Sequence, residues 1–423
     1  MILIRHRNST TPFSAGTLLR AAFKLPVPVW AALLIHATGP SIPFCGASVL
    51  SSGGVGYPAG FAGARYAGMG GVSISLADPS SAGSWNPASL AEIRLTRLDI
   101  EYLYENNTFR DASGSSRSPY SNFNGFTLAL PFGRGLSAAF GLSPCTRADY
   151  RIAYPDSLAG ETFNKSVEAS GGLNSADAAF AFRIRHWADF GLKAHYFFGK
   201  LDETWRIVFN GTGFTGTTDL LSSRMKGFSF TAGCIVHPLR VLSLGAVYRP
   251  GFDVDTEVER YADPLSGFPA LHTGTITMPT AWGIGVHGIL PKGLLAAAEY
   301  STEAWSRMTI NGRSAPHLAD AERLAFGLEW LPGLLPTDGF FRRTAYRAGF
   351  SVGRFYRTDA ENGPVREITA TLGAGLPLGN AASRMDASVA IGRRGGLSDN
   401  SFEEDFVRVS VSASLAEKWF TRK

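Results

Sequence analysis

Short segments in which apolar and polar side chains alternate recur along the chain beyond residue 95. In "RLDIEYLYE", which begins at Arg97, the Leu, Ile and Tyr side chains share one face, while Asp99 and Glu101 share the other. "RMDASVAIGRR" from Arg384 and "DFVRVSVSASL" from Asp405 alternate in the same way. Strict alternation indicates a β-strand with one apolar and one polar face. The chain therefore predicts an all-β fold.

About fourteen segments follow this pattern. They lie near residues 96–105, 120–131, 136–144, 173–185, 188–200, 222–236, 240–250, 273–289, 293–304, 321–331, 342–356, 365–377, 384–394 and 402–416. After the first 47 residues, no apolar run approaches the roughly 18 residues of a membrane helix.

The connections between these segments alternate between short and long. The short ones include "PFGRG" at 131–135, "HWA" at 186–188, "HPLR" at 237–240 and "LPKG" at 290–293; the long ones are about 106–119, 145–172, 201–221, 251–272 and 305–320. One short link, 331–343, is longer than its class predicts. Short turns, long loops and an even strand count are typical of an outer-membrane β-barrel whose two ends face the periplasm. We therefore predict a transmembrane antiparallel barrel over residues 96–423, in the outer membrane of a Gram-negative bacterium.

Residues 1–47 contain no Asp or Glu, and basic residues precede the apolar run "LPVPVWAALLIHA". Small residues follow at 45–48. This order predicts a secretory signal peptide cleaved near Ala47. A membrane anchor is the weaker alternative, because thirteen residues with two prolines are too short to span a bilayer.

Charge and cysteine content argue against a nucleic-acid-binding protein and against a fold held by a disulfide. Removing the four Lys/Arg residues of the leader takes the formal charge from +5 to about +1, so no basic patch indicates a nucleic-acid partner. The two cysteines that remain, Cys145 and Cys234, fall near opposite ends of the predicted strands. They are too far apart for a disulfide.

A secreted β-sandwich or propeller is the soluble alternative, but no 40–50-residue repeat supports a propeller.

Residues 48–95 precede the first strand and lack a long alternating segment. They include "GARYAGMGGVSISLADPSSAGSWNPASLAEI", which is rich in Gly and Ala and contains an Asn-Pro turn former. A barrel of about fourteen strands encloses more space than its own side chains fill. We therefore predict that residues 48–95 form a hatch that plugs the barrel.

The same stretch resembles the N-terminal hatch of the outer-membrane long-chain fatty-acid transporter (FadL-like) family. "FTLALPFGRGLSAAFGLSP" (126–144) and "ITMPTAWGIGV" (276–286) resemble strands of that family, and "FVRVSVSASLAEKWF" (406–420) resembles the C-terminal strand of related barrels. Two departures are the Trp at 85, where the family usually has Tyr, and the "GMGG" at 68–71. With the "EKWF" ending, "GMGG" resembles a sister branch of uncharacterised barrels that includes the PorV-like subunit of the type IX secretion system.

The resemblance implies passive uptake of hydrophobic small molecules, either fatty-acid-like or aromatic. In the family, the hatch and a kink in the third strand shape the route. The residues that match the hatch motif or its surroundings are Asp78, Trp85, Asn86, Pro87 and Ala88; Gly141 and Pro144 are the candidates for the kink, since either would weaken strand pairing. A purely structural turn that locks hatch to wall is the alternative reading of Asn86-Pro87-Ala88.

Two other functions stay open. The chain could be a PorV-like barrel that binds or shuttles exported proteins of a secretion system, or a structural protein whose only partner is outer-membrane lipid. Catalysis is not expected, because Gly211–Gly216 and Gly349–Gly353 match GxGxxG and GxSxG without the required strand and helix context. The histidines lack metal-ligand spacing, so neither a metal nor another cofactor is expected.

Overall fold

The computed structural model describes residues 48–419, except for 53–54, 60–62, 159–160, 210, 212–213, 264–269, 334–336, 360–362 and 379–381. The predicted signal peptide lies outside these residues. No helix in the described part of the chain is long and apolar enough to cross a membrane.

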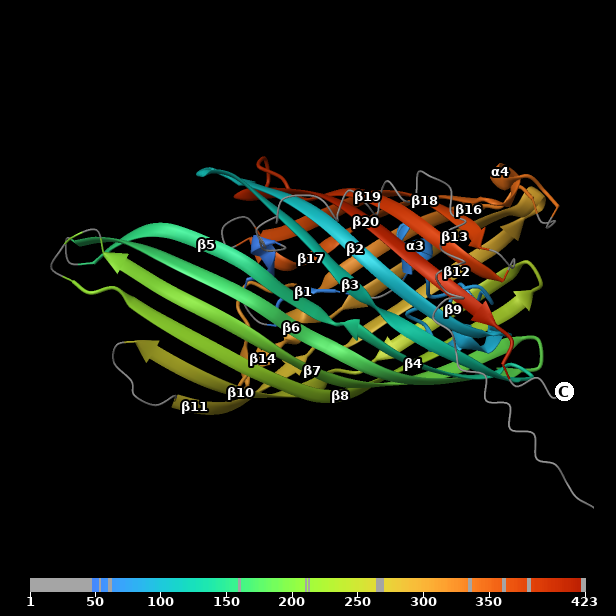
Figure 1. Cartoon of the computed structure of the whole chain (residues 1–423), viewed down its shortest axis with the longest axis horizontal. Coiled ribbons are helices and arrows are strands. Elements are labelled where there is room, and N and C mark those ends of the chain that lie inside the picture. The colour runs from blue at the N-terminus through green and yellow to red at the C-terminus, as the bar shows by residue number, and fades with distance from the viewer. Residues whose placement is uncertain are drawn as a thin grey trace, which may run out of the picture. The chain divides into compact units, whose positions relative to one another are not determined.

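A closed barrel of fourteen antiparallel strands forms the body of the protein (Figure 1). β2 pairs with β20 and closes the ring. Several barrel strands are interrupted, so that β4 and β5, β9 and β10, β11 and β12, β13 and β14, and β15 and β16 are successive parts of single strands. The strands are β1 (Tyr57–Pro58), β2 (Thr96–Asp111), β3 (Gly114–Gly133), β4 (Leu136–Pro144), β5 (Thr146–Leu158), β6 (Glu161–Ile184), β7 (Ala188–Phe209), β8 (Thr217–Leu239), β9 (Leu242–Arg249), β10 (Phe252–Asp263), β11 (Ala270–Met278), β12 (Ala281–Leu290), β13 (Leu294–Glu303), β14 (Thr309–Ile310), β15 (Arg313–Ser314), β16 (Ala321–Trp330), β17 (Ala345–Asp359), β18 (Gly363–Leu378), β19 (Ser383–Gly395) and β20 (Phe402–Glu417).

Among the described residues, helices are few and short. They are η1 (Val49–Ser51), α3 (Gly63–Ala67), η2 (Pro87–Glu92), η3 (Pro291–Gly293), η4 (Trp305–Arg307) and α4 (Phe340–Arg343). The predicted all-β barrel with an N-terminal hatch is confirmed, since α3 and η2 belong to a segment enclosed by the strands.

Alternation along the strands sorts side chains between lipid and lumen. On β2, Asp99 and Glu101 are buried inside the barrel, while Ile100 and Tyr102 are exposed on its outer face. Because the outer face of a barrel contacts hydrocarbon and its interior can be polar, this arrangement is the one expected for a membrane-spanning wall.

The connections that the sequence predicts as long loops are largely strand. Residues 145–172 form β5 and the first half of β6, and 106–119 form the ends of β2 and β3. β6, β7 and β8 are 24, 22 and 23 residues long, well beyond the 9–11 that cross a bilayer. Outside the membrane a strand no longer needs an apolar outer face, so its alternation weakens and the sequence pattern underestimates its length.

Candidate functional site

The hatch occupies the lumen at the end of the barrel where β20 ends, the right-hand side of Figure 1. Its own core is small and fully buried: Tyr66, Met69, Val72 and Leu76 pack with Ala297 and Ala325 of the wall. Residues 63–93 therefore bury their apolar side chains against the wall as well as against each other.

Glycines in the wall allow the hatch backbone to approach closely. A Cβ atom added at Gly349 would lie 2.0 Å from the Gly70 nitrogen, and one at Gly191 would lie 2.4 Å from the Ala88 nitrogen. These strand glycines are thus explained by close backbone contact. The wall glycines at which an added Cβ would meet the hatch include Gly191, Gly233, Gly245, Gly285, Gly327, Gly349 and Gly373.

Asn86 joins the hatch to the wall. Its Oδ1 accepts a hydrogen bond from the Ala88 nitrogen at 3.0 Å and so caps η2, which begins at Pro87. Its Nδ2 donates to the carbonyls of Ile74, Cys234 and Ala246, at 2.8, 3.0 and 3.3 Å. The last two carbonyls belong to β8 and β9, so the predicted Asn-Pro-Ala motif forms both a helix cap and a clamp.

Replacing Asn86 by Ala should loosen this clamp while leaving the barrel folded. The change leaves buried carbonyls and one N–H without their partner, at a cost of about 3 kcal/mol in hatch stability. Added protease should cut the hatch faster, while the heat-modifiable gel shift of the barrel persists. Loss of the folded barrel would instead assign Asn86 a purely structural role.

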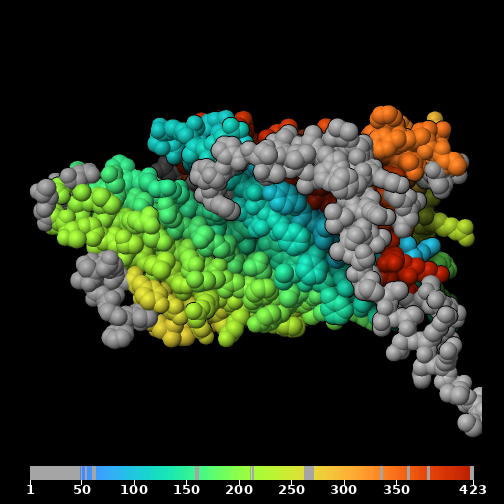
Figure 2. Space-filling view, viewed as in Figure 1, coloured from blue at the N-terminus to red at the C-terminus, as the bar shows by residue number. Residues whose placement is uncertain are grey.

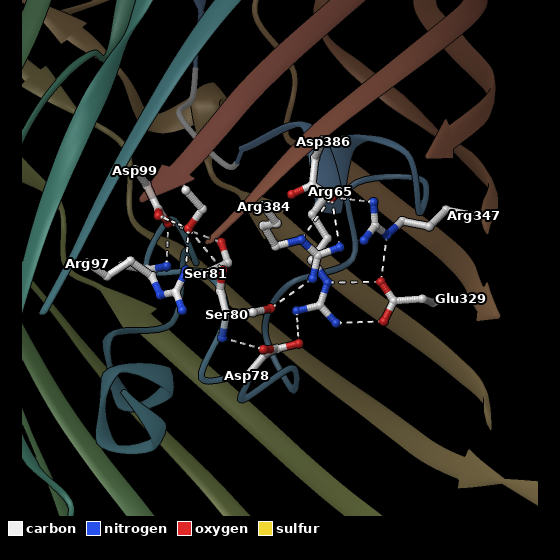
Figure 3. Close-up of polar contacts among 12 residues, drawn as sticks. Arg65, Asp78, Ser80, Ser81, Arg97, Asp99, Glu329, Arg347, Arg384 and Asp386 are labelled. Atoms are coloured by element: carbon white, nitrogen blue, oxygen red, sulfur yellow. Dashed lines mark hydrogen bonds and ion pairs between the residues drawn. The ribbon is translucent and has the colours of Figure 1, made fainter. Parts of the chain in front are cut away.

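A buried ionic network holds the other half of the hatch (Figure 3). Arg65 on α3 donates to Glu329 of β16 at 3.0 and 2.8 Å and also pairs with Asp78. Arg347 of β17 bridges Glu329, at 2.6 Å, and Asp386 of β19, at 2.7 Å.

Arg384 completes the network. It donates to Asp386 at 2.8 Å and to the Ser80 hydroxyl of the hatch at 2.9 Å. The network thus contains three guanidinium groups and three carboxylates, and its charge balances. Burial alone would raise the pKa of Asp78, but the Arg65 and Arg384 charges lower it below its ordinary value.

Wall carboxylates also bind the hatch backbone. Glu299 of β13 accepts hydrogen bonds from the Ser73 and Ile74 nitrogens at 2.7 and 2.8 Å. Asp99 of β2 accepts one from the Ala82 nitrogen at 2.6 Å. Asp99 and Glu101 share the polar face of the first predicted strand, and Asp99 contacts the hatch. Glu329, Arg347 and Glu299 were not predicted, because nothing in a single strand's sequence indicates which inward charge faces the hatch.

The wall is broken between β3 and the third barrel strand. β3 pairs with β4 only through residues 126–133, although β3 itself begins at Gly114. Beyond Pro144 the third strand continues as β5, which pairs with β6 but not with β3. In the described part of the chain, Arg147 spans the break, with its guanidinium 4.7 Å from the centre of the Tyr120 ring.

The N-terminal segment borders this break on the lumen side. β1 pairs with β5 in the register Tyr57↔Arg147 and Pro58↔Thr146, and the Ala59 nitrogen donates to the Cys145 carbonyl at 2.8 Å. The Tyr57 hydroxyl accepts a hydrogen bond from Arg394 of β19 at 2.8 Å. The segment therefore connects the edge of the break to β19, four strands away around the barrel.

The two kink candidates take different positions. Pro144 is the last residue of β4 and stands directly at the break, whereas Gly141 pairs regularly with Thr127. Gly125 of β3 was missed by sequence reasoning, although it faces the break with a positive φ of 116°. The only indication of this position in the sequence is that an isolated glycine interrupts an alternating segment.

A cavity of about 500 Å³ lies in the lumen beside the break. Trp85 of the hatch, Phe197 of β7 and Tyr356 of β17 contribute aromatic surface, while Arg249 and Glu303 contribute charge. Residues at the break line the same cavity: Tyr57, Pro58, Asn124, Pro144, Cys145 and Arg147. The space inside the barrel therefore reaches the gap in its wall.

A second apolar cluster lies next to the cavity and includes Leu50 and Val55, which precede α3. Phe197 stacks on Phe252 at a ring separation of 4.5 Å, and Trp305 contacts Tyr356 at 5.1 Å. Buried members of this cluster include Leu50, Val55, Tyr150, Val167, Leu173, Phe197, Leu201, Met225, Phe252, Val254, Ile276, Met278, Trp305, Met308, Phe355, Tyr356 and Val365.

One cluster has the residue types of a metal site. Glu92, Asp189 and His237 place ligand atoms within 4.8 Å of one another. Arg183 already pairs with Glu92 at 2.6 Å and with Asp189 at 2.7 Å. An internal cation thus offsets part of the charge of the two carboxylates, and we interpret the cluster as a further link between η2 and the wall. Cys145 and Cys234 are both free thiols, as predicted.

The fold and the lumen define a transmembrane antiparallel β-barrel plugged by an N-terminal hatch. Three solved structures share the fold at low identity. The Pseudomonas putida toluene transporter TodX is 14% identical, with 86% of this chain and 99% of that chain covered and a TM-score of 0.58. CymD, a monoaromatic hydrocarbon channel, is 12% identical, with 86% and 99% covered and a TM-score of 0.57. A Pseudomonas aeruginosa FadL homologue is 14% identical, with 86% and 99% covered and a TM-score of 0.54.

The chain belongs to the BamG family, which it matches over residues 45–423. No curated protein matches it.

Proposed function

We propose that the protein is an outer-membrane barrel of a Gram-negative bacterium for passive uptake of hydrophobic small molecules. The observation that carries the proposal is the continuity between the lumenal cavity and the wall break. Pro144, Cys145 and Arg147 belong to the interrupted third strand and also line the cavity. A molecule held there has a lateral path out of the barrel.

The position of the break along the barrel axis would allow an apolar solute to pass into the membrane. Pro144 pairs with Asn174 of β6, which pairs with Phe198 of β7, and Phe198 is the last exposed aromatic residue on β7 before the exposed Lys200. Aromatic side chains mark the boundary between hydrocarbon and headgroups. The break therefore opens at the outer boundary of the apolar band, where a hydrophobic molecule can enter lipid without crossing bulk water.

Blocking the break at Cys145 tests this function. Cells that express the protein should accumulate radiolabelled toluene or palmitate faster than cells with an empty vector. A bulky maleimide on Cys145 should reduce that accumulation severalfold. The matched control carries Cys145→Ser and keeps Cys234, which does not line the cavity. No accumulation of either probe above the vector level would refute the uptake function.

A protein-binding role of the PorV-like kind is the second candidate. It is favoured by the charged part of the cavity lining and by β3, whose residues 114–124 have no strand on the edge facing the break. An unpaired strand edge accepts an extended peptide. Recovery of exported proteins with the barrel, from cells in which neither probe accumulates, would favour this role.

A further inference from the structure

Basic residues stand in the turns at the end of the barrel where the hatch enters. Five of the six turns that join strands there carry an exposed Arg or Lys next to exposed apolar side chains. The sixth, between β18 and β19, lies partly outside the described residues, and its sequence from Gly379 to Ser383 contains neither Arg nor Lys. The cations are Arg134, Arg185, Arg240, Lys292 and Arg342, and we call them the inner ring.

The inner ring lacks compensating acid. Within the described residues, only Arg342 has a carboxylate within ion-pair distance, Asp338 at 3.6 Å. Most exposed cations in the outer half of the wall are paired instead, for example Arg151 with Glu168 at 3.0 Å and Lys200 with Asp202 at 2.9 Å. In the described residues, exposed cations without a nearby carboxylate are thus the rule in the inner ring and the exception in the outer half of the wall.

Backbone geometry does not explain these cations. Arg134, Arg185 and Lys292 have φ of 54°, 53° and 65°, in the left-handed region. That conformation favours Gly or Asn over a long side chain. A cation at three such positions costs backbone strain that Asn would reduce, so the side chain itself must serve a purpose.

The ring lies at the edge of the lipid-facing surface. On β6, Phe182 and Ile184 are exposed on the outer face directly before Arg185, and Trp187 follows it. On the turn between β16 and β17, orange in Figure 2, Phe341 is 75% exposed beside Arg342. Aromatic residues and cations at a membrane boundary occupy the level of the headgroups.

We propose that the inner ring binds the phosphate groups of anionic phospholipids in the inner leaflet of the outer membrane. The guanidinium and ammonium groups meet the phosphates, while the neighbouring Phe, Trp and Leu side chains enter the acyl boundary. The proposal is independent of any transported solute, since none of the five cations lines the cavity.

Lipid retention by the purified, folded barrel tests the proposal. The protein is exchanged into detergent with equal amounts of phosphatidylglycerol and phosphatidylcholine, and the lipid that stays bound is measured by native mass spectrometry. The wild type should prefer phosphatidylglycerol, by roughly fivefold for each cation engaged, and lose the preference in high salt. The inner-ring variant carries Arg134→Asn, Arg185→Asn, Arg240→Gln, Lys292→Asn and Arg342→Gln and should lose the preference at low salt.

The matched control removes five exposed cations from the outer half of the wall and should keep the preference. It carries Arg151→Gln, Lys200→Gln, Arg224→Gln, Lys226→Gln and Arg260→Gln. Equal retention of the two lipids by the wild type would overturn the proposal, as would an undiminished preference in the inner-ring variant. If that variant fails to fold, the salt dependence of the wild type and the pair Arg134→Asn and Lys292→Asn still decide the question.

Discussion

Replacing Arg347 by Met should weaken the binding of the hatch to the barrel wall while the barrel itself stays folded. The Arg347 side chain is fully buried and bridges Glu329 and Asp386, at 2.6 and 2.7 Å. Removing one partner of a buried ion pair costs about 3–5 kcal/mol, because the remaining charge stays desolvated. Two guanidinium groups would then face three carboxylates. Planar-bilayer conductance should rise from that of a closed barrel to that of an open pore.

A second substitution separates charge balance from packing. Arg347→Met combined with Asp386→Asn restores an equal number of cations and carboxylates, and the pore should close again in part. Arg354→Met on the same strand is the control, since Arg354 is 44% exposed and its nearest carboxylate, on Glu322, is 3.9 Å away. An exposed pair contributes at most about 1 kcal/mol. Equal conductance changes for Arg347→Met and Arg354→Met would contradict the role of the network.

The sequence predicts which strands form the barrel wall better than it predicts which of their inward-facing side chains contact one another. Alternation identifies the faces of β2, where Asp99 points inward and Tyr102 points outward, because each strand must match lipid on one side. It does not identify that Glu329, Arg347 and Asp386 meet one another, since they lie on different strands and their encounter depends on barrel closure. Long-range register is absent from any single segment.

The hatch is predicted in a similar, partial way. Asn86 is recognisable from its motif, and the structure gives it partners on both hatch and wall. The glycines that receive the hatch, such as Gly349, look like ordinary weak points in a strand when only the sequence is known. Their purpose requires the coordinates of the backbone that approaches them, which comes from a segment almost 300 residues earlier in the chain.

The N-terminal segment contacts both the barrel wall around the hatch and the edge of the break. Trp85 lines the cavity and precedes Asn86, which is bound to β8 and β9, while β1 lies along the edge of the break. The N-terminal segment thus contacts both the floor of the cavity and its lateral opening. β1 pairs with β5, whereas Arg65 binds Glu329 and Asp78, so the contacts at the break and the ionic network of the hatch involve different residues.

Gly349→Val should produce the strongest steric release of the hatch. A Cβ at Gly349 would lie 2.0 Å from the Gly70 nitrogen and 2.2 Å from the Met69 carbonyl carbon, and both atoms are backbone. Neither side can yield by a rotamer change, so the cost should reach or exceed the roughly 3 kcal/mol upper end of ordinary overpacking. Residues 69–70 should lose their close contact with β17, and protease should cut the hatch from the periplasmic side.

Gly288→Val supplies the matched comparison, because it also adds a side chain to a strand glycine. A Cβ there has only one neighbour within 4 Å, the Val241 carbonyl oxygen at 3.8 Å. This variant should keep wild-type conductance and protease resistance, since ordinary van der Waals contact needs no movement of the hatch. If Gly349→Val also remained closed and resistant, the hatch would not depend on close backbone contact with β17, and the explanation of the wall glycines would have to be abandoned.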